Sequence, residues 1–330
     1  MSREKILSLL LEQGDSYVSG EAMSRTLGIS RTAVWKAIEA LRQEGYEIQS
    51  ATKRGYRLER APDRVREGEL AGPLSGCHVG SRLICLDVID STNTEAKRQA
   101  MAGASDGLVI LSEEQTGGRG RLGRSFQSPR GTGLYFSALL RPSLPPQEVV
   151  DFTAWVAVAV CDGIQAACGV RPRIKWTNDI VLGGRKLCGI LTELGLEGES
   201  NALDYLITGI GVNVNQRTED FLPEVRPIAV SLAQELGRPV RRAELAVEII
   251  RALDRMYAGF PDNKAEYLAR YRADCLTPGN QVQLITPVSR EEAFALEIDD
   301  QFRLVVEYPD GRRAALSAGE VSVRGMYGYV

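Results

Sequence analysis

The sequence KWTNDIVLGGRKLCGI, residues 175–190, contains the clearest structural signal in the chain. The Gly183-Gly184 pair is a two-residue turn signal between apolar runs, which predicts a β-hairpin. Lys186 stands at the start of the second strand, whose other residues are mostly apolar, so its ammonium group needs an anionic partner. Asn178 and Asp179 lie at the end of the opposite strand, near enough to share a pocket with Lys186. An ordinary surface Lys–Asp pair is the alternative interpretation.

A second polar stretch, QTGGRGRLGRSFQSPRGTG at residues 115–133, holds six glycines and four arginines. Residues 118–123 formally match the GxGxxG motif of dinucleotide-binding proteins. That motif requires a helix to begin inside it, whereas the residues that follow include Pro129 and Gly131 and break helices. Arginines among glycines can instead surround phosphate groups with their side chains. The alternative is a mobile, solvated basic loop.

Outward from these two stretches, residues 70–275 alternate between strand-like and helix-like segments. Strands are predicted at 82–89, 108–115, 133–142 and 205–215, and helices at about 147–168 and 241–273. Residues 92–95, TNTE, have the pattern of a capping box at the start of a helix. This order predicts an α+β domain with a mostly antiparallel or mixed central sheet. Residues 276–330 show short strands separated by turns, which predicts a small all-β barrel.

Residues 1–62 are predicted to form a separate DNA-binding module. Two short helices joined by a turn at Gly28 form a helix-turn-helix, and residues 46–59 alternate like two strands around a basic tip, which would make a wing. The first 66 residues have an excess of basic residues, whereas the rest of the chain is acidic. Residues 61–70 are expected to be a charged linker. A small helical domain without a DNA role is the alternative. The residues expected to contact DNA are Ser30, Arg31, Thr32, Trp35 and Lys36 in the recognition helix, and Lys53 and Arg54 at the tip of the wing.

The composition limits the classes of function. The six cysteines are scattered and the only histidine is His78, which disfavours a disulfide framework, a zinc site and a histidine-based triad. The most apolar stretch, FTAWVAVAVC at 152–161, is much shorter than the roughly 20 residues of a membrane span, so we expect a buried helix there. The N-terminal residues do not have the pattern of a signal peptide. We therefore expect a cytoplasmic protein with no membrane partner.

Taken in order, these stretches resemble the biotin protein ligases. The matching motifs are STNTEA (91–96), EEQTGGRGRLGRSFQSP (113–129), KWTNDIVLGGRKLCGIL (175–191) and GIGVNVN (209–215). The N-terminal winged helix-turn-helix and the C-terminal barrel are similar to the bifunctional branch of that family, the biotin operon repressors. The resemblance implies an α+β multidomain fold: a winged helix-turn-helix domain at 1–62, a catalytic domain at 70–275 and a small SH3-like β-barrel at 276–330.

The resemblance also implies a two-step reaction and a regulatory role. Biotin and ATP with Mg²⁺ would give biotinyl-5'-AMP and pyrophosphate, and a lysine of biotin carboxyl carrier protein would then accept the biotinyl group. Biotinyl-5'-AMP would also act as a corepressor of biotin genes, by favouring a homodimer on operator DNA. The residues suit this chemistry independently, because cations and rigid positioning accelerate attack of a carboxylate on a phosphate without an enzyme nucleophile. The magnesium ligands are not assigned.

The motif matches carry the family's site residues onto this chain. Lys186, Arg121 and Asp179 are implied to be catalytic, Lys186 as the main electrostatic catalyst and Asp179 by orienting the incoming lysine. The residues implied to bind biotin are Ser91, Thr92, Asn93, Gln115, Arg119, Gly120, Arg121, Lys186 and Gly189. Those implied to bind ATP and the adenylate are Arg121, Arg124, Phe126, Lys175, Asn178 and Asn213. Thr92 keeps an alternative role as a helix cap, and Asn213 as a strand-end turn residue.

Two positions depart from the family pattern. Members commonly have proline where Thr177 lies and tryptophan where Phe126 lies; Phe126 can still cover adenine, but with a smaller face. Two other functions remain open: a transcription regulator that only senses its ligand, and a lipoate or octanoate transferase on the same type of fold. The set of Arg121, Lys186 and Asp179 favours a ligase over a sensor, and the winged helix favours it over a transferase.

Overall fold

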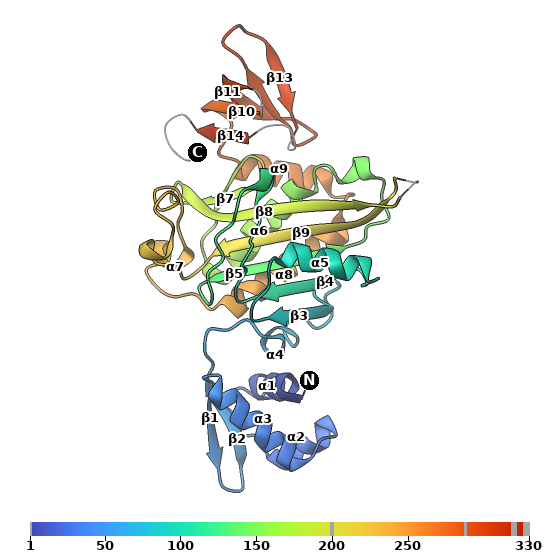
Figure 1. Ribbon diagram of the computed structural model, residues 1–330, viewed down its shortest axis with the longest axis vertical. Coiled ribbons are helices and arrows are strands. Elements are labelled where there is room, and N and C mark those ends of the chain that lie inside the picture. The colour runs from blue at the N-terminus through green and yellow to red at the C-terminus, as the bar shows by residue number, and fades with distance from the viewer. Residues whose placement is uncertain (1, 199–200, 287–288, 318–321, 326–330) are drawn as a thin grey trace.

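The fold was analysed in a computed structural model that describes residues 2–198, 201–286, 289–317 and 322–325. Three parts follow one another along the long axis of the molecule (Figure 1). A helical module with a hairpin lies at the N-terminal end, a large sheet covered by helices lies in the middle, and a smaller sheet lies at the other end.

The N-terminal module is a helix-turn-helix followed by a hairpin. Ser19 and Ser30 cap the second and third helices through their side chains, and Gly28 ends the second helix with φ 64°. Val18 and Tyr56 exchange two backbone hydrogen bonds of 2.8 and 2.9 Å, which fasten the hairpin to the loop before the second helix. The elements are α1 (Ser2–Glu12), α2 (Gly20–Leu27), α3 (Arg31–Gln43), β1 (Glu47–Ala51) and β2 (Gly55–Arg60).

The central sheet has seven strands in the order β3-β4-β5-β9-β8-β7-β6. β3 and β4 are parallel and the other neighbours are antiparallel, so the sheet is mixed, as predicted. α5 lies on one face, and α6 and α8 cover the other (Figure 1). The strands are β3 (Arg82–Leu86), β4 (Leu108–Ser112), β5 (Gly133–Leu140), β6 (Arg173–Lys175), β7 (Asp179–Leu182), β8 (Arg185–Leu196) and β9 (Leu203–Asn213). The helices are α4 (Glu67–Leu70), α5 (Thr92–Met101), α6 (Phe152–Cys168), α7 (Leu232–Leu236), α8 (Arg242–Gly259) and α9 (Lys264–Asp274), with 3₁₀ turns at Arg121–Gly123, Pro146–Val149 and Thr218–Asp220.

α6 is the apolar helix that the sequence predicts from residues 152–161. Phe152, Trp155 and Ile164 are among its many fully buried side chains. The segment Pro146–Cys168 is long and apolar enough to cross a membrane, but 67% of its most apolar window is buried inside the protein. The helix therefore belongs to the core, where it packs against α8 and the central sheet.

The C-terminal strands form an antiparallel sheet, and the predicted closed barrel is not observed. The order is β13-β12-β11-β10-β14, which leaves β13 and β14 at opposite edges without a pairing between them in the described residues. Each of these two edge strands has only four residues, whereas closure of a sheet requires its strands to tilt and stagger against one another. The strands are β10 (Gln281–Ile285), β11 (Arg290–Ile298), β12 (Leu304–Glu307), β13 (Arg313–Leu316) and β14 (Ser322–Gly325).

Residues 61–70 lie between the N-terminal module and the central part, and they make close contacts with the central part (Figure 1). Asp63 Oδ2 lies 3.0 Å from Arg242 Nε, and the Asp63 carbonyl oxygen accepts a hydrogen bond of 2.6 Å from Arg242 Nη2. The Arg242 side chain is 1% exposed and also pairs with Glu113 at 2.8 Å. Glu113 in turn accepts a hydrogen bond of 2.7 Å from the Val65 N–H. Asp63, Glu113 and Arg242 are called the linker clamp below.

Candidate functional site

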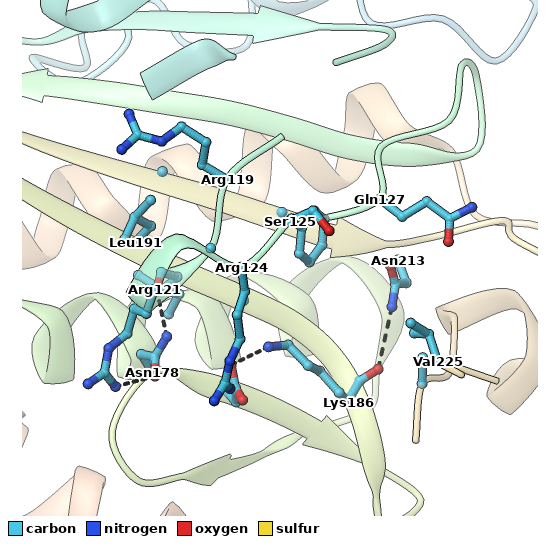
Figure 2. Close-up of a pocket in the computed structure, with 18 of the residues that line it drawn as sticks. Arg119, Arg121, Arg124, Ser125, Gln127, Asn178, Lys186, Leu191, Asn213 and Val225 are labelled. Carbon is cyan, nitrogen blue, oxygen red and sulfur yellow. Dashed lines mark hydrogen bonds and ion pairs between the residues drawn. The ribbon is translucent and has the colours of Figure 1, made fainter. Parts of the chain in front are cut away.

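A cavity of about 870 Å³ opens on the face of the central sheet that carries α5. Side chains from several separate segments line it; Arg124 and Lys186 reach the same region, whereas Arg121 lies beside Asn178 (Figure 2). All the residues that the sequence predicts for the ligand and catalytic sites line this cavity: Ser91, Thr92, Asn93, Gln115, Arg119, Gly120, Arg121, Arg124, Phe126, Lys175, Asn178, Asp179, Lys186, Gly189 and Asn213.

Glycines on two neighbouring strands form the floor of the cavity. Gly189 of β8 and Gly211 of β9 lie directly opposite each other in the sheet. A Cβ atom at Gly211 would lie 2.5 Å from Phe126 Cε1, and one at Gly189 would lie 3.4 Å from Lys186 Cε. A Cβ atom at Gly209 would collide with the Asn93 side chain. Phe126, Lys186 and Asn93 therefore rest directly on the backbone of the sheet.

A network of hydroxyl and amide groups lies at the start of α5. Gln115 Oε1 accepts hydrogen bonds from the Thr92 N–H at 2.8 Å and from the Thr92 hydroxyl at 3.1 Å. Ser137 Oγ of β5 lies 2.8 Å from Thr92 Oγ1 and 2.6 Å from Asn93 Oδ1. The predicted capping box at residues 92–95 is wrong, because Thr92 lies inside the helix, after Ser91, and directs its hydroxyl to Gln115 and Ser137.

The arginine loop is folded back on itself above the cavity. Gly120 N–H donates to Arg124 O at 2.7 Å, and Phe126 N–H donates to Gly118 O at 2.9 Å. The Arg121 guanidinium donates from Nη1 to Asn178 Oδ1 at 2.9 Å. Burial lowers the pKa of Arg121, and the nearby Asp179 carboxylate opposes that shift. The loop thus holds a half-buried cation against the hairpin that the sequence predicts.

Lys186 faces the cavity because of an irregularity in the hairpin. Ile180 pairs with Cys188 but Val181 pairs with Lys186, so Leu187 is an extra residue in β8. Such a bulge changes the direction of the neighbouring side chains. Lys186 Nζ lies 2.6 Å from Asp179 Oδ1, and the two side chains are 28% and 19% exposed. The lysine therefore has the anionic partner that its position in an apolar strand requires.

Asn178 and Asn213 both have contacts within the protein. Asn178 Nδ2 donates to Ile190 O at 2.8 Å, while its Oδ1 accepts from Arg121. Asn213 Nδ2 donates to Val230 O at 3.1 Å and lies 3.4 Å from Lys186 O. The strand-end structural role that the sequence leaves open for Asn213 is therefore present, while its side chain still lines the cavity.

The cavity also contains residues that the sequence reasoning does not identify. Gln283 of β10 and Val323 of β14 line it, so the C-terminal sheet contributes to its wall. Trp176 fixes that sheet in place, because its indole N–H donates to Phe302 O at 3.0 Å. These contacts depend on how separate elements dock, which no local sequence pattern specifies. The alternating glycines of GIGVNVN were the available signal for Gly209 and Gly211, since glycines inside a strand often mark a close approach.

The residues predicted to contact DNA lie together on the N-terminal module. Arg31, Thr32, Trp35 and Lys53 line a groove between the start of α3 and the tip of the β1–β2 hairpin. Trp35 is 53% exposed and stands on the open face of α3. Lys36 and Arg54 are also exposed, and the Arg54 guanidinium lies 4.3 Å from the centroid of the Tyr17 ring. Ser30 instead accepts a hydrogen bond from the Ala33 N–H as the cap of α3.

The described residues contain no group of three or more histidine, cysteine, aspartate or glutamate side chains arranged to hold a metal ion. Three carboxylates line the cavity: Asp179, Asp220 and Glu224. Mg²⁺ in nucleotide sites is commonly held by one or two carboxylates together with substrate phosphates. A magnesium ion that enters on ATP is compatible with this set, whereas a preformed metal cage is not observed in the part of the chain described.

Comparisons with known proteins agree with this geometry. The biotin/lipoate A/B protein ligase family matches residues 85–213, and an HTH domain matches residues 2–57. The bifunctional ligase/repressor BirA of Bacillus spizizenii is 37% identical over 317 residues, which cover 96% of this chain and 97% of that protein. The protein of the same name from Escherichia coli is 31% identical over 322 residues, or 96% of each chain.

Solved structures show the same relationship for most of the chain. The biotin protein ligase of Aquifex aeolicus in complex with biotin and ATP superposes with a TM-score of 0.63 at 27% identity. The match covers 74% of this chain and 99% of that chain. The two BirA proteins, by contrast, match nearly the full length, including the helix-turn-helix. The chain belongs to the family of bifunctional biotin ligase/repressors.

Proposed function

We infer that this chain is an ATP-dependent biotin protein ligase and also a DNA-binding repressor of biotin genes. The observation that carries the ligase function is the meeting of Lys186, Arg121 and Asp179 in a cavity that elsewhere presents hydroxyl and amide groups. A ureido ring needs hydrogen-bond donors and acceptors, whereas a carboxylate and phosphates need cations. The cavity supplies both kinds of group on one face of the sheet.

In the first step, a biotin carboxylate oxygen attacks the α-phosphorus of ATP, the bond to the bridging oxygen breaks, and pyrophosphate leaves. Lys186 and Arg121 offset the negative charge that gathers as two anions approach. Asn178 fixes the Arg121 guanidinium at 2.9 Å, so this cation is in place before the substrates arrive. Charge stabilisation by groups that are already oriented is a large source of catalysis.

In the second step, the amine of a carrier-protein lysine attacks the acyl carbon of biotinyl-5'-AMP. An amide bond forms, AMP leaves, and a proton is lost from the nitrogen. The ordinary pKa of a lysine is about 10.4, so the amine must lose a proton before it attacks. Asp179, at the edge of the hairpin beside Lys186, is the carboxylate that orients this amine. The carrier is biotin carboxyl carrier protein.

The remaining contacts are proposed from the motif matches, and the residues concerned all line the cavity. Ser91, Thr92, Gln115 and the backbone near Arg119 and Gly120 hold the biotin ring, while Phe126 covers adenine. The other proposed ligands are Asn93 and Gly189 for biotin, and Arg124, Lys175, Asn178 and Asn213 for ATP and the adenylate. Asp179, Asp220 and Glu224 are the carboxylates of the cavity that would hold a magnesium ion bound to ATP, and such an ion would neutralise part of the phosphate charge.

The regulatory half of the function uses the N-terminal module. The groove beside Arg31 and Lys53 takes the DNA backbone, with α3 in the major groove. We propose domains at 1–62, 70–275 and 276–330, the last an SH3-like module. ATP as a substrate and the six free cysteines fit a reducing, cytoplasmic compartment without a membrane partner.

A homodimer is proposed as the DNA-binding form. β8 continues to Leu196, while its pairing with β7 ends at Gly189, which leaves its distal edge open on that side within the described strands. Leu194 and Leu196 are 46% and 49% exposed there. An open strand edge with exposed apolar residues favours pairing with another chain. Sedimentation equilibrium with and without biotinyl-5'-AMP tests this, and a ligand-independent monomer would contradict it.

One assay separates the ligase from its competitors. The chain is incubated with ATP, Mg²⁺, biotin and the apo carrier protein, and the mass of the carrier is measured. We expect a mass gain of one biotinyl group. No gain with biotin would leave the sensor function, and a gain with lipoate or octanoate in its place would identify the transferase.

A further inference from the structure

Glu193 of β8 contacts Asn93 and Arg119, two residues that line the cavity, and was not among the predicted site residues. Side chains two residues apart along a strand share a face. Gly189, Leu191 and Glu193 therefore form one row on the face of the sheet that carries α5. Gly189 lies under Lys186, and Leu191 lines the cavity. Glu193 ends the row next to the start of α5, and its side chain is 29% exposed.

One carboxylate oxygen of Glu193 holds Asn93. Asn93 Nδ2 donates to Glu193 Oε2 at 2.9 Å and to Leu191 O at 3.2 Å. Asn93 Oδ1 lies 2.6 Å from Ser137 Oγ, and the missing side chain of Gly209 makes room for the amide. The segment that begins α5 is thereby tied across the sheet to β8.

The other carboxylate oxygen faces the arginine loop. Glu193 Oε1 lies 3.8 Å from Arg119 Nη1. In Figure 2 the Arg119 side chain points away from the region that Arg124 and Lys186 reach. The backbone of Arg119 also pairs with that of Ser125. The contact between Glu193 and Arg119 is therefore made at the point where the two ends of the arginine loop tip meet. Arg119 thus has a role in the loop that is distinct from that of the other two arginines.

We propose that Glu193 is a positioning residue for biotin, acting through Asn93 and Arg119. Its two oxygens link the two segments between which the proposed function places the biotin ring: the start of α5 and the base of the arginine loop. It does not touch Lys186, Asp179 or Asn178 in the described contacts, so it sets the affinity for biotin and not the rate of the chemical step. This inference rests on the ligase function proposed above.

Glu193→Ala tests the proposal in the full-length chain. Loss of the Asn93 acceptor and of the Arg119 pair is expected to raise KM for biotin and the Kd measured by calorimetry by about tenfold. The kcat of pyrophosphate release and KM for ATP should remain at wild-type values. A purely structural defect would instead change both KM values and the thermal midpoint together.

Conservative variants separate the two contacts. Glu193→Gln keeps an oxygen for Asn93 but loses the charge that faces Arg119, so KM for biotin should rise only about twofold, as expected for an exposed ion pair. Arg119→Gln should have a similar effect, and the double variant should be no worse than either single one. Glu95→Gln is the matched control, because Glu95 lies on α5 but bonds to Arg98 and Gln99.

Several results would overturn the proposal. They are a wild-type KM for biotin in Glu193→Ala, a fall in kcat with KM unchanged, or equal rises in KM for biotin and ATP. Because Glu193→Gln preserves the shape of the side chain, the proposal remains testable if the alanine variant does not fold: strictly additive effects of Glu193→Gln and Arg119→Gln would refute the link. A wild-type chain that forms no biotinyl-5'-AMP would refute the ligase function itself, whereas active wild type with an unaffected Glu193→Ala refutes only this inference.

Discussion

Lys186 owes its position to one extra residue in β8. The bulge at Leu187 places the lysine over Gly189 and within 2.6 Å of Asp179, beside the segment at 228–230. Lys186→Ala removes the cation that we propose to act on the biotin carboxylate. We expect the rate of pyrophosphate release to fall by about 100-fold to 1000-fold, as for loss of other oriented electrostatic groups.

The adjacent Arg185 provides the control for this substitution. Its guanidinium pairs with Glu235 at 2.7 Å, and it is not among the residues that line the cavity. Arg185→Ala should therefore leave pyrophosphate release close to the wild-type rate. Wild-type rates in Lys186→Ala would show that this lysine is not the electrostatic catalyst.

Gly211 controls the position of the aromatic ring proposed to cover adenine. A methyl group there would lie 2.5 Å from Phe126 Cε1, so Gly211→Ala must displace the ring. Loss of one aromatic contact is worth about 1 kcal/mol, which predicts a rise of about fivefold in KM for ATP. Steady-state kinetics of Gly211→Ala at varied ATP concentration measure this KM. Gly72→Ala is the control, since its Cβ would have no neighbour closer than 3.7 Å, and an unchanged KM in Gly211→Ala would contradict the role of Phe126.

For individual residues, the sequence predicted which side chains share the cavity, but not which partners hold these side chains in position. Lys186 and Asp179 were predictable because a charged residue in an apolar strand needs a partner nearby. Ser137 and Glu193 were not, because each is an ordinary residue in its own strand and gains its contacts only when α5 docks on the sheet. The sequence GIG indicated a close approach at Gly209 and Gly211. That Gly211 lies opposite Gly189 follows only from the register of β8 and β9.

Among the elements, the short helix α4 connects the N-terminal module to the central part of the molecule. Its Glu69 accepts a hydrogen bond of 2.7 Å from the Tyr46 hydroxyl of the N-terminal module and pairs with Arg241 at 3.0 Å. Burial raises the pKa of Glu69 to about 7, although Tyr46 and Arg241 oppose the shift. The carboxyl group is thus close to half-protonated near neutral pH.

This raised pKa makes stability depend on pH with a definite sign. The folded chain binds the Glu69 proton more tightly than the unfolded chain, whose carboxyl has the ordinary value of 4.5. The resulting stabilisation is complete below that value and is lost as the pH rises through about 7. Relative to Glu69→Gln, which cannot titrate, the wild-type free energy of unfolding should fall by at most about 3 kcal/mol between pH 5 and 8.

Urea unfolding at several pH values measures this difference. Glu67→Gln, on the exposed side of the same helix, makes the same chemical change without removing a buried carboxyl and should follow the wild-type profile. If Glu69→Gln and the wild type have parallel profiles, the raised pKa does not contribute to folding stability.

The elements themselves were largely predictable where the signal is local. The helix-turn-helix follows from serine caps and Gly28, and the 175–190 hairpin follows from its glycine turn. The capping box at 92–95 failed because Thr92 has a tertiary partner in Gln115 that competes with the local cap. The predicted closed barrel of the C-terminal strands was not confirmed, because closure depends on the tilt and stagger between strands, which the pattern of each single strand does not specify.

For the whole molecule, the least predictable feature is how the DNA-binding module is attached. The sequence indicated a charged linker at 61–70, but Asp63 of that segment pairs with Arg242, whose side chain is 1% exposed and also pairs with Glu113. Asn215, two residues beyond Asn213 of the cavity, also donates to Asp63 at 2.9 Å. Charged residues alone do not distinguish a solvated linker from a buried ion network, because the difference lies in partners far away in the sequence.

The linker clamp predicts which N-terminal deletions leave the catalytic part stable. Deletion of residues 1–62 retains Asp63 and Val65, so we expect loss of operator binding with ligation within a few-fold of wild type. Deletion of residues 1–66 leaves the buried Arg242 with Glu113 as its remaining carboxylate, and breaking a buried ion network costs about 3–5 kcal/mol. The longer deletion should therefore unfold at a lower temperature and ligate poorly, and Asp63→Ala in the full-length chain should show the same instability without loss of the module. Thermal unfolding and carrier mass measure these effects, and two deletions of equal stability would show that the linker clamp does not stabilise the catalytic part.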